Sequence, residues 1–224
     1  MDKVETVFDL LDRWRRLPSY QLERRADIFF AYYLPEILPE CLMEKLTDEL
    51  QYKLKDERIT HDNIIPEFPL LKSSFEDNYD GKRKNDSRKV DYVVFGNNMF
   101  YLIELKTDMN SLDNPTQKRY MAQAKNKKLS DLIRDIEELA NSQSKGPYKD
   151  KYAYLTKQLH DQIERLNKVG KKPEDLDKVA IYIQPDGSIP FEEGYVITFK
   201  DVAKCLEKYD SRFSDSLRKW ILKQ

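Results

Sequence analysis

The densest apolar pattern in the chain runs from Arg88 to Asp108, with the sequence RKVDYVVFGNNMFYLIELKTD. β-Branched and aromatic residues fill both arms and turn-forming residues fill the middle, a pattern typical of two strands joined by a tight turn. Because asparagine tolerates a positive φ, we place the turn at Asn97-Asn98. In the antiparallel register that follows from this turn, Gly96 faces Met99.

Side chains alternate between the two faces of a strand, so this register also sorts the hairpin residues by face. One face is apolar near the turn and charged at its far end, where Asp91 is expected opposite Glu104, with Lys106 beside them. The other face is apolar throughout. Strands that are apolar on both faces are covered on both sides, so the pattern predicts a layered α/β domain with a mixed central sheet.

Apolar residues at helical spacing predict three helices before the hairpin. The first covers residues 4–14 and ends at Pro18. The second opens on a serine cap and runs over residues 19–35. The third covers residues 42–54 and carries many charges of both signs.

Glu23 and Asp27 lie four residues apart on the second predicted helix, so they project from one face of it. Two interpretations remain open from this spacing. The two acids either face the sheet, as part of a site, or pair with the neighbouring Arg24 and Arg25 on a solvated face.

Two segments lead into the hairpin. Residues 64–71, IIPEFPLL, have strand-like side chains, but Pro66 and Pro69 cannot donate to a ladder, so an edge strand is predicted. Residues 73–87 are polar and predict a surface loop. This loop and the start of the next strand form the most basic short stretch of the chain, which either is solvated or contacts phosphates. Its cations are Lys82, Arg83, Lys84, Arg88 and Lys89.

The segments after the hairpin predict helices and two further strands. Asn114-Pro115-Thr116-Gln117 is a strong helix start, and this helix carries the cations Lys118, Arg119 and Lys125. Further helices and two strands are predicted for the rest of the chain. They are helices over 129–139 and 152–166, a buried strand parallel to its neighbour over 179–183, a strand over 195–199 and closing helices over 202–221.

Composition limits the classes of protein to consider. The chain has 224 residues, of which 40 % are apolar and 35 % charged, and this composition predicts a soluble globular protein. Because the net charge is -1, any binding site for a polyanion is expected to be a local patch of cations. The sequence predicts no signal peptide or membrane span, so we expect a cytoplasmic protein. Cys41 and Cys205 are expected to be buried, reduced thiols rather than part of a disulfide framework or zinc site.

The charged end of the hairpin suggests a hydrolytic metal site. Two carboxylates that face each other repel, and a divalent cation shared by Asp91 and Glu104 would offset that repulsion. Mg²⁺, or Mn²⁺ as its substitute, would be held by these two acids, with the carbonyl of Leu105 as a further ligand, and Lys106 would orient the attacking water. The alternative is a buried salt bridge in which Lys106 neutralises Glu104.

Val90-Asp91 followed by Glu104-Leu105-Lys106 after a hairpin resembles the motif of the PD-(D/E)XK phosphodiesterase superfamily, whose fold is restriction-endonuclease-like. The order of predicted elements from Ser19 to Ile183 is similar to its αβββαβ core. Val90 stands where the family motif has proline.

The resemblance implies catalytic roles for Asp91, Glu104 and Lys106 and a third acid on the leading helix, Glu23 or Asp27, with Glu67 also left open. Gln117 and Tyr120 resemble a glutamine and a tyrosine of the exonuclease branch, although they lie three rather than four residues apart.

The resulting expectation is a single domain over residues 1–224, with a core over 19–199 and helical extensions over 1–18 and 200–224. Its expected function is that of an Mg²⁺-dependent nuclease acting on DNA in preference to RNA. The alternative is an inactive nucleic-acid-binding or assembly module that keeps the nuclease fold. The aromatic run Phe29-Phe30-Ala31-Tyr32-Tyr33 leaves a homodimer open as well.

Overall fold

The computed structural model shows an α/β protein with a mixed, open five-stranded sheet. The structure describes residues 4, 8, 23–74, 87–107, 115–142, 145–188, 194–209 and 211–224. Within these ranges no helix is both long enough and apolar enough to cross a membrane.

The sheet has the strand order β1-β2-β3-β4-β5. β1 pairs with β2 and β2 with β3 in antiparallel fashion, whereas β4 and β5 are parallel. Their bounds are β1 (Ile64–Leu71), β2 (Ser87–Phe95), β3 (Met99–Leu105), β4 (Asp177–Gln184) and β5 (Tyr195–Thr198).

The hairpin register predicted from the sequence is confirmed. Tyr92 pairs with Ile103 and Phe95 with Phe100, and the backbone N–H of Gly96 donates to the carbonyl of Met99 at 2.9 Å. β1 lies at the edge of the sheet, as its two prolines predict. Buried side chains fill both faces of β3, so the expectation of a covered strand is also confirmed.

Seven helices lie within the described residues. They are α2 (Glu23–Leu42), α3 (Asp48–Leu54), α4 (Pro115–Asn126), α5 (Leu129–Ser142), α6 (Lys149–Lys168), α7 (Phe199–Leu206) and α8 (Arg212–Ile221). Short 3-10 turns cover His61–Asn63, Lys72–Ser74 and Pro173–Asp175.

Helix α2 corrects two predictions. It does not end near Pro35 but continues through Pro35 and Pro39 to Leu42. Proline removes one backbone hydrogen bond, yet Leu34, Leu38 and Leu42 are fully buried, and their packing keeps the segment helical. The third helix therefore begins at Asp48 rather than at residue 42.

Other predicted bounds differ by less or lie outside the description. Phe199 begins α7 instead of ending β5, because Thr198 caps that helix through its side-chain oxygen and the backbone N–H of Asp201, 3.1 Å apart. The predicted helix over 4–14 lies outside the described residues except for Val4 and Phe8. Of the predicted loop over 73–87, residues 75–86 lie outside them too.

Internal contacts divide the chain into two compact units. The first unit contains residues 1–55, 104–114 and 181–224. The second contains residues 56–103 and 115–180. The hairpin turn thus belongs to the second unit, and the end of β3 to the first.

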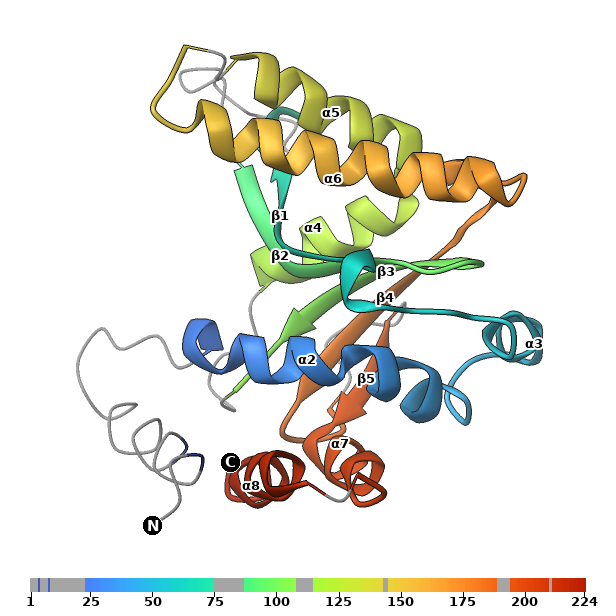
Figure 1. Cartoon of the computed structure of the whole chain (residues 1–224), viewed down its shortest axis with the longest axis vertical. Helices are drawn as coiled ribbons and strands as arrows, with labels where there is room; N and C mark the ends of the chain where they lie inside the picture. The colour runs from blue at the N-terminus through green and yellow to red at the C-terminus, as the bar shows by residue number, and fades with distance from the viewer. Residues whose placement is uncertain are drawn as a thin grey trace. The chain divides into compact units, whose positions relative to one another are not determined.

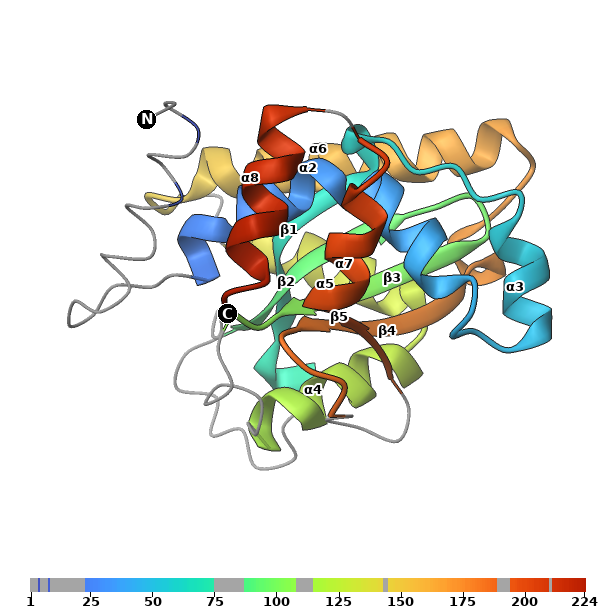
Figure 2. The same ribbon diagram turned by 90° about the horizontal axis from the view of Figure 1, so that it is seen from below.

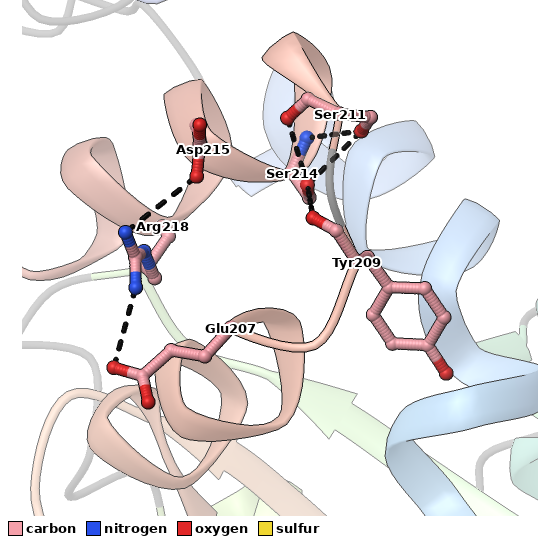
Figure 3. Close-up of polar contacts among 6 residues, drawn as sticks. All are labelled: Glu207, Tyr209, Ser211, Ser214, Asp215 and Arg218. Carbon is pink, nitrogen blue, oxygen red and sulfur yellow. Dashed lines mark hydrogen bonds and ion pairs between the residues drawn. The ribbon is translucent and has the colours of Figure 1, made fainter.

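In the first unit, α2 packs on α7 and β5, and α7 packs on α8, as Figure 2 shows. The corner between α7 and α8 is held by side chains (Figure 3). Ser211 caps α8 by accepting from the backbone N–H of Ser214 at 3.1 Å, and Arg218 bridges Glu207 at 3.2 Å and Asp215 at 3.5 Å.

The second unit combines the β1-β2 ladder with α4, α5 and α6, the three helices that follow the hairpin in the sequence. α5 and α6 lie side by side (Figure 1), and α5 contacts β1. α6 ends before Gly170, whose φ of 74° is the left-handed conformation expected of a helix-terminating glycine. The break between α4 and α5 falls at residues 127–128.

Candidate active site

Glu104 and Lys106 lie at the carboxyl end of β3, in the first unit. The Glu104 side chain is fully buried and Lys106 is 7 % exposed. Lys106 Nζ lies 3.5 Å from Glu104 Oε2, which is an ion-pair distance but longer than a strong charge-assisted hydrogen bond. Burying a charge is unfavourable unless it is compensated, so each side chain depends on the other.

Strand β4 adds two residues to the same face. The backbone N–H of Lys106 donates to the carbonyl of Ile183 at 2.8 Å. The backbone N–H of Asp177 donates to the carbonyl of Asn98 at 3.0 Å, so β3 and β4 run parallel, and the register places Glu104 beside Tyr182 and Lys106 beside Gln184. Burial, and secondarily the charge of Glu104, raises the pKa of the Tyr182 phenol, so this phenol stays protonated at neutral pH.

Gln184 was missed by the sequence analysis. Its side chain is fully buried, and its amide nitrogen donates to the carbonyls of Asp186 at 3.0 Å and Ser188 at 2.6 Å. Among the residues that the structure describes, no hydrogen-bond partner reaches Gln184 Oε1. A buried acceptor without a partner is unfavourable by about 1–3 kcal/mol and is a site for an unseen water or ligand.

One signal in the sequence could have identified Gln184. Gln184 is the polar last residue of the apolar run VAIYIQ, and the carboxyl ends of β3 and β4 both lie at this position. In open α/β sheets, ligands bind outside the carboxyl ends of parallel strands. A polar side chain there is therefore a candidate for function.

Asp91 lies in β2, in the second unit, and its side chain is half-buried. Pro66 pairs with Tyr92 and Phe68 with Val90, so Glu67 stands opposite Asp91 in the β1-β2 ladder. Glu67 has a φ of 53°, the one positive φ among described residues other than glycine. The backbone of a residue with a side chain is strained in this left-handed conformation. Its carboxylate pairs with Lys89 at 2.6 Å.

Gln117 and Tyr120 lie on α4 in the same unit. The Tyr120 side chain is buried, and its hydroxyl donates to the backbone carbonyl of Lys89 at 3.2 Å. This bond fixes the first turns of α4 against β2, next to the strand residue Asp91. Gln117 is half-buried one helical turn before Tyr120.

The other predicted site residues divide into three groups. Lys82, Arg83 and Lys84 lie outside the described residues, as does the side chain of Glu23. Asp27 is half-buried on α2 and accepts from the backbone N–H of Ile28 at 2.6 Å. The cations of the second unit reach solvent to different degrees: Arg88, Lys118 and Lys125 are half-buried, and Lys89 and Arg119 are exposed.

Within the described part of the chain, no three His, Cys, Asp or Glu side chains are grouped so as to hold a metal ion. Magnesium does not require such a group, because it keeps several waters and is commonly bound by one or two carboxylates. A buried carboxylate at Glu104 and the unpartnered amide oxygen of Gln184 are hard oxygen ligands of the kind that Mg²⁺ prefers. These residues fit the ion by their chemistry.

Another carboxylate, that of the half-buried Glu57, lies at the hairpin turn and was also missed. It accepts from the backbone N–H groups of Asn97 and Asn98, the latter at 3.1 Å. Burial raises its pKa to about 7 even though these bonds and the charges of Lys171 and Arg165 lower it. Because Glu57 holds backbone groups of the turn, its role is structural.

Comparisons with known proteins returned no matching family model, no matching curated protein and no matching solved structure.

Proposed function

We propose that this protein is a metal-dependent phosphodiesterase that cleaves nucleic acid, with DNA as the preferred substrate. The proposal is supported chiefly by one observation. A fully buried carboxylate, Glu104, and a buried ammonium, Lys106, lie at the carboxyl end of β3, beside the Gln184 amide oxygen at the end of β4, which has no hydrogen-bond partner among the described residues. Ligands bind at the carboxyl ends of the strands in open α/β sheets. Burying three polar groups together is unfavourable, so it is not expected in a core that serves packing alone.

Glu104 and Asp91 are the residues proposed to hold Mg²⁺ or Mn²⁺, with the Leu105 carbonyl as a further oxygen. Asp91 is included because of the hairpin register. Tyr92 pairs with Ile103, and the neighbouring residues away from the turn are Asp91 on β2 and Glu104 on β3. The Gln184 amide oxygen is an additional candidate. When bound, the ion supplies Lewis-acid activation of a water and of the phosphoryl oxygens.

Lys106 is proposed to position the attacking water and to stabilise negative charge on the phosphoryl oxygens in the transition state. A cation fixed in a buried site is suited to this role, because its charge acts through a low dielectric and needs no reorganisation. Tyr182, with its raised pKa, remains a hydrogen-bond donor beside the Glu104 carboxylate and does not act as a base. The exposed and half-buried cations of the second unit would contact the phosphate backbone.

Nuclease assays on the full-length chain test this proposal. We would incubate single- and double-stranded DNA and RNA with the protein and Mg²⁺ or Mn²⁺, and measure Mn²⁺ binding by calorimetry. Glu104→Gln and Asp91→Asn should abolish both metal binding and cleavage. Glu49→Gln, which alters an exposed carboxylate on α3, serves as the matched control and should change neither.

Two outcomes would contradict the proposal. Undiminished Mn²⁺ binding in both acid variants would refute the metal site. Binding of nucleic acid by the wild-type protein without cleavage under any metal condition would instead favour the alternative, an inactive nucleic-acid-binding module with a buried Glu104–Lys106 ion pair.

A further inference from the structure

A cleft of about 550 Å³ lies in the second unit between the β1-β2 ladder and helix α6. Its floor includes residues of one ladder face, Ile65, Glu67, Pro69, Ser87 and Lys89, and its other wall is the segment from Tyr148 to Gln158. The volume is within the range of small-molecule sites in proteins. No residue of the cleft belongs to the Glu104–Lys106 pair.

Three tyrosines line the α6 side of this cleft: Tyr148, Tyr152 and Tyr154. Tyr148 is 54 % exposed and Tyr154 is 64 % exposed. An exposed aromatic ring contributes little to folding, and two of them at one cleft offer faces on which a planar ligand can stack.

The charge around the cleft is positive. Residues 145–158 carry four lysines and one acid, and two lysines, Lys89 and Lys151, line the cleft itself. Lys151 Nζ lies 5.6 Å from the centre of the Tyr148 ring, so a cation and an aromatic face are presented together. Glu67 is the one acid of the lining, and it is paired with Lys89.

The edge strand excludes one class of occupant. A peptide that binds beside an edge strand does so by extending the sheet through backbone hydrogen bonds. β1 carries Pro66 and Pro69, which cannot donate such bonds, and Glu67 between them has a strained backbone with a positive φ. The cleft therefore suits a ligand recognised by stacking and charge rather than by strand pairing.

We propose that this cleft binds a segment of single-stranded nucleic acid, with bases stacked on Tyr148 and Tyr154 and phosphates near Lys151 and Lys89. Sequence-independent single-strand sites combine these two features, aromatic platforms and a cationic track. A duplex keeps its bases stacked on each other and cannot offer them to the tyrosines.

The choice of nucleic acid as the ligand of this cleft rests on the proposed function. The inference narrows the substrate of that function to single-stranded nucleic acid or unpaired ends. The cleft face of the ladder is also the face of Asp91. Glu67, opposite Asp91, lines the cleft, and Lys89, two residues before Asp91 on the same strand, does so as well.

Fluorescence anisotropy on the full-length protein tests the inference. The probe is a fluorescein-labelled oligothymidylate roughly 12 nucleotides long, within the site sizes typical of such proteins, titrated in EDTA so that no metal-dependent cleavage occurs. Tyr148→Ala and Tyr154→Ala should each weaken binding about tenfold, whereas the Phe variants should bind as the wild type does. Tyr52→Ala, at a 71 % exposed tyrosine on α3, is the matched control and should have no effect.

The outcomes separate this inference from the proposed function. Wild-type affinity in the Tyr148→Ala, Tyr154→Ala double variant, or duplex binding as tight as single-strand binding, would overturn the single-strand cleft even if the protein cleaves DNA. Tyrosine-dependent binding of the oligothymidylate would support it even if Mg²⁺ and Mn²⁺ produced no cleavage, in which case the proposed function alone would fail.

Discussion

Lys106 Nζ lies 3.5 Å from Glu104 Oε2, and both side chains are buried at the carboxyl end of β3. A pair of this kind has two explanations, one structural and one functional. In the first, the ammonium neutralises the carboxylate and nothing else is needed. In the second, the carboxylate also serves a metal ion, and the ammonium acts on the substrate. The two explanations differ in how the folded state responds to a divalent cation.

Lys106→Met separates them, because methionine keeps most of the apolar stem and removes the charge. Without metal, the buried Glu104 carboxylate loses the positive charge of Lys106, and we expect the free energy of unfolding to fall by about 3 kcal/mol. With saturating Mn²⁺, a functional site should recover most of that loss while cleavage remains absent. Urea denaturation with and without Mn²⁺ measures both effects.

The control for this experiment is Lys157→Met, which removes an exposed lysine paired with Asp161 on α6. An exposed pair contributes little, so the stability of this variant should stay close to that of the wild type and should not depend on Mn²⁺. If Lys106→Met were equally destabilised in the presence and absence of Mn²⁺, the structural explanation would be correct.

Arg165 holds the hairpin turn, and its replacement by lysine should destabilise the second unit. Its guanidinium donates to the carbonyls of Phe95 at 2.7 Å and Gly96 at 2.9 Å, to Asn97 Oδ1 at 2.9 Å and to Gln162 Oε1 at 3.2 Å. Lysine cannot reproduce this planar set of donors. We expect Arg165→Lys to lower the free energy of unfolding by about 2–4 kcal/mol, as measured by chemical denaturation.

The matched variant is Arg134→Lys on α5, where the arginine is 62 % exposed and pairs with Asp131. Its stability should stay within about 0.5 kcal/mol of the wild type. Equal stability of the two variants would mean that the guanidinium bonds to the turn are not maintained in solution.

The hairpin could be predicted residue by residue because its signals are local. Strand alternation has a strict period of two, and the turn residues set the register, so Tyr92 opposite Ile103 follows from the sequence alone. The end of α2 could not be predicted in the same way. Pro35 and Pro39 are local signals for a helix end, but burial of the surrounding leucines outweighs them.

The candidate site was predicted only in part, for a related reason. Glu104 and Lys106 stand out because charged residues at the end of an apolar strand are rare. Gln184 joins them through the β3-β4 register, and Glu57 meets the Asn97 backbone across 40 residues of chain. Such pairings depend on how distant segments pack, which residue spacing does not encode.

The two cysteines should be unreactive in the folded protein. Both are buried free thiols, and Cys205 Sγ lies 3.3 Å from Glu40 Oε2. A hydrogen bond with Cys41, together with burial, raises the pKa of the Cys205 thiol, so its reactive thiolate is scarce at pH 8. We expect the aromatic disulfide reagent DTNB to label neither thiol until urea unfolds the chain. Rapid labelling of native protein would contradict this packing.

Glu57 should make stability depend on pH. Burial raises the pKa of its carboxyl from 4.5 to about 7 in the folded protein, although bonds from Asn98 and Asn97 oppose the shift. Between these two pH values the folded state binds more protons than the unfolded state. The contribution of the Glu57 carboxyl to the free energy of unfolding is therefore fully present below pH 4.5 and is lost as the pH rises to about 7. The free energy of unfolding falls by at most about 3 kcal/mol over this range.

Glu57→Gln keeps an oxygen acceptor for the turn and removes the titration. Denaturation of wild type and variant at several pH values from 4.5 to 8 should show the wild type losing stability relative to Glu57→Gln as the pH rises, since only the wild-type carboxyl is ionised inside the fold. Glu49→Gln on α3 should follow the wild-type curve, because Glu49 is exposed. A constant difference between wild type and Glu57→Gln across this range would show that the buried carboxyl is ionised throughout, held by the backbone N–H groups and by Lys171 and Arg165.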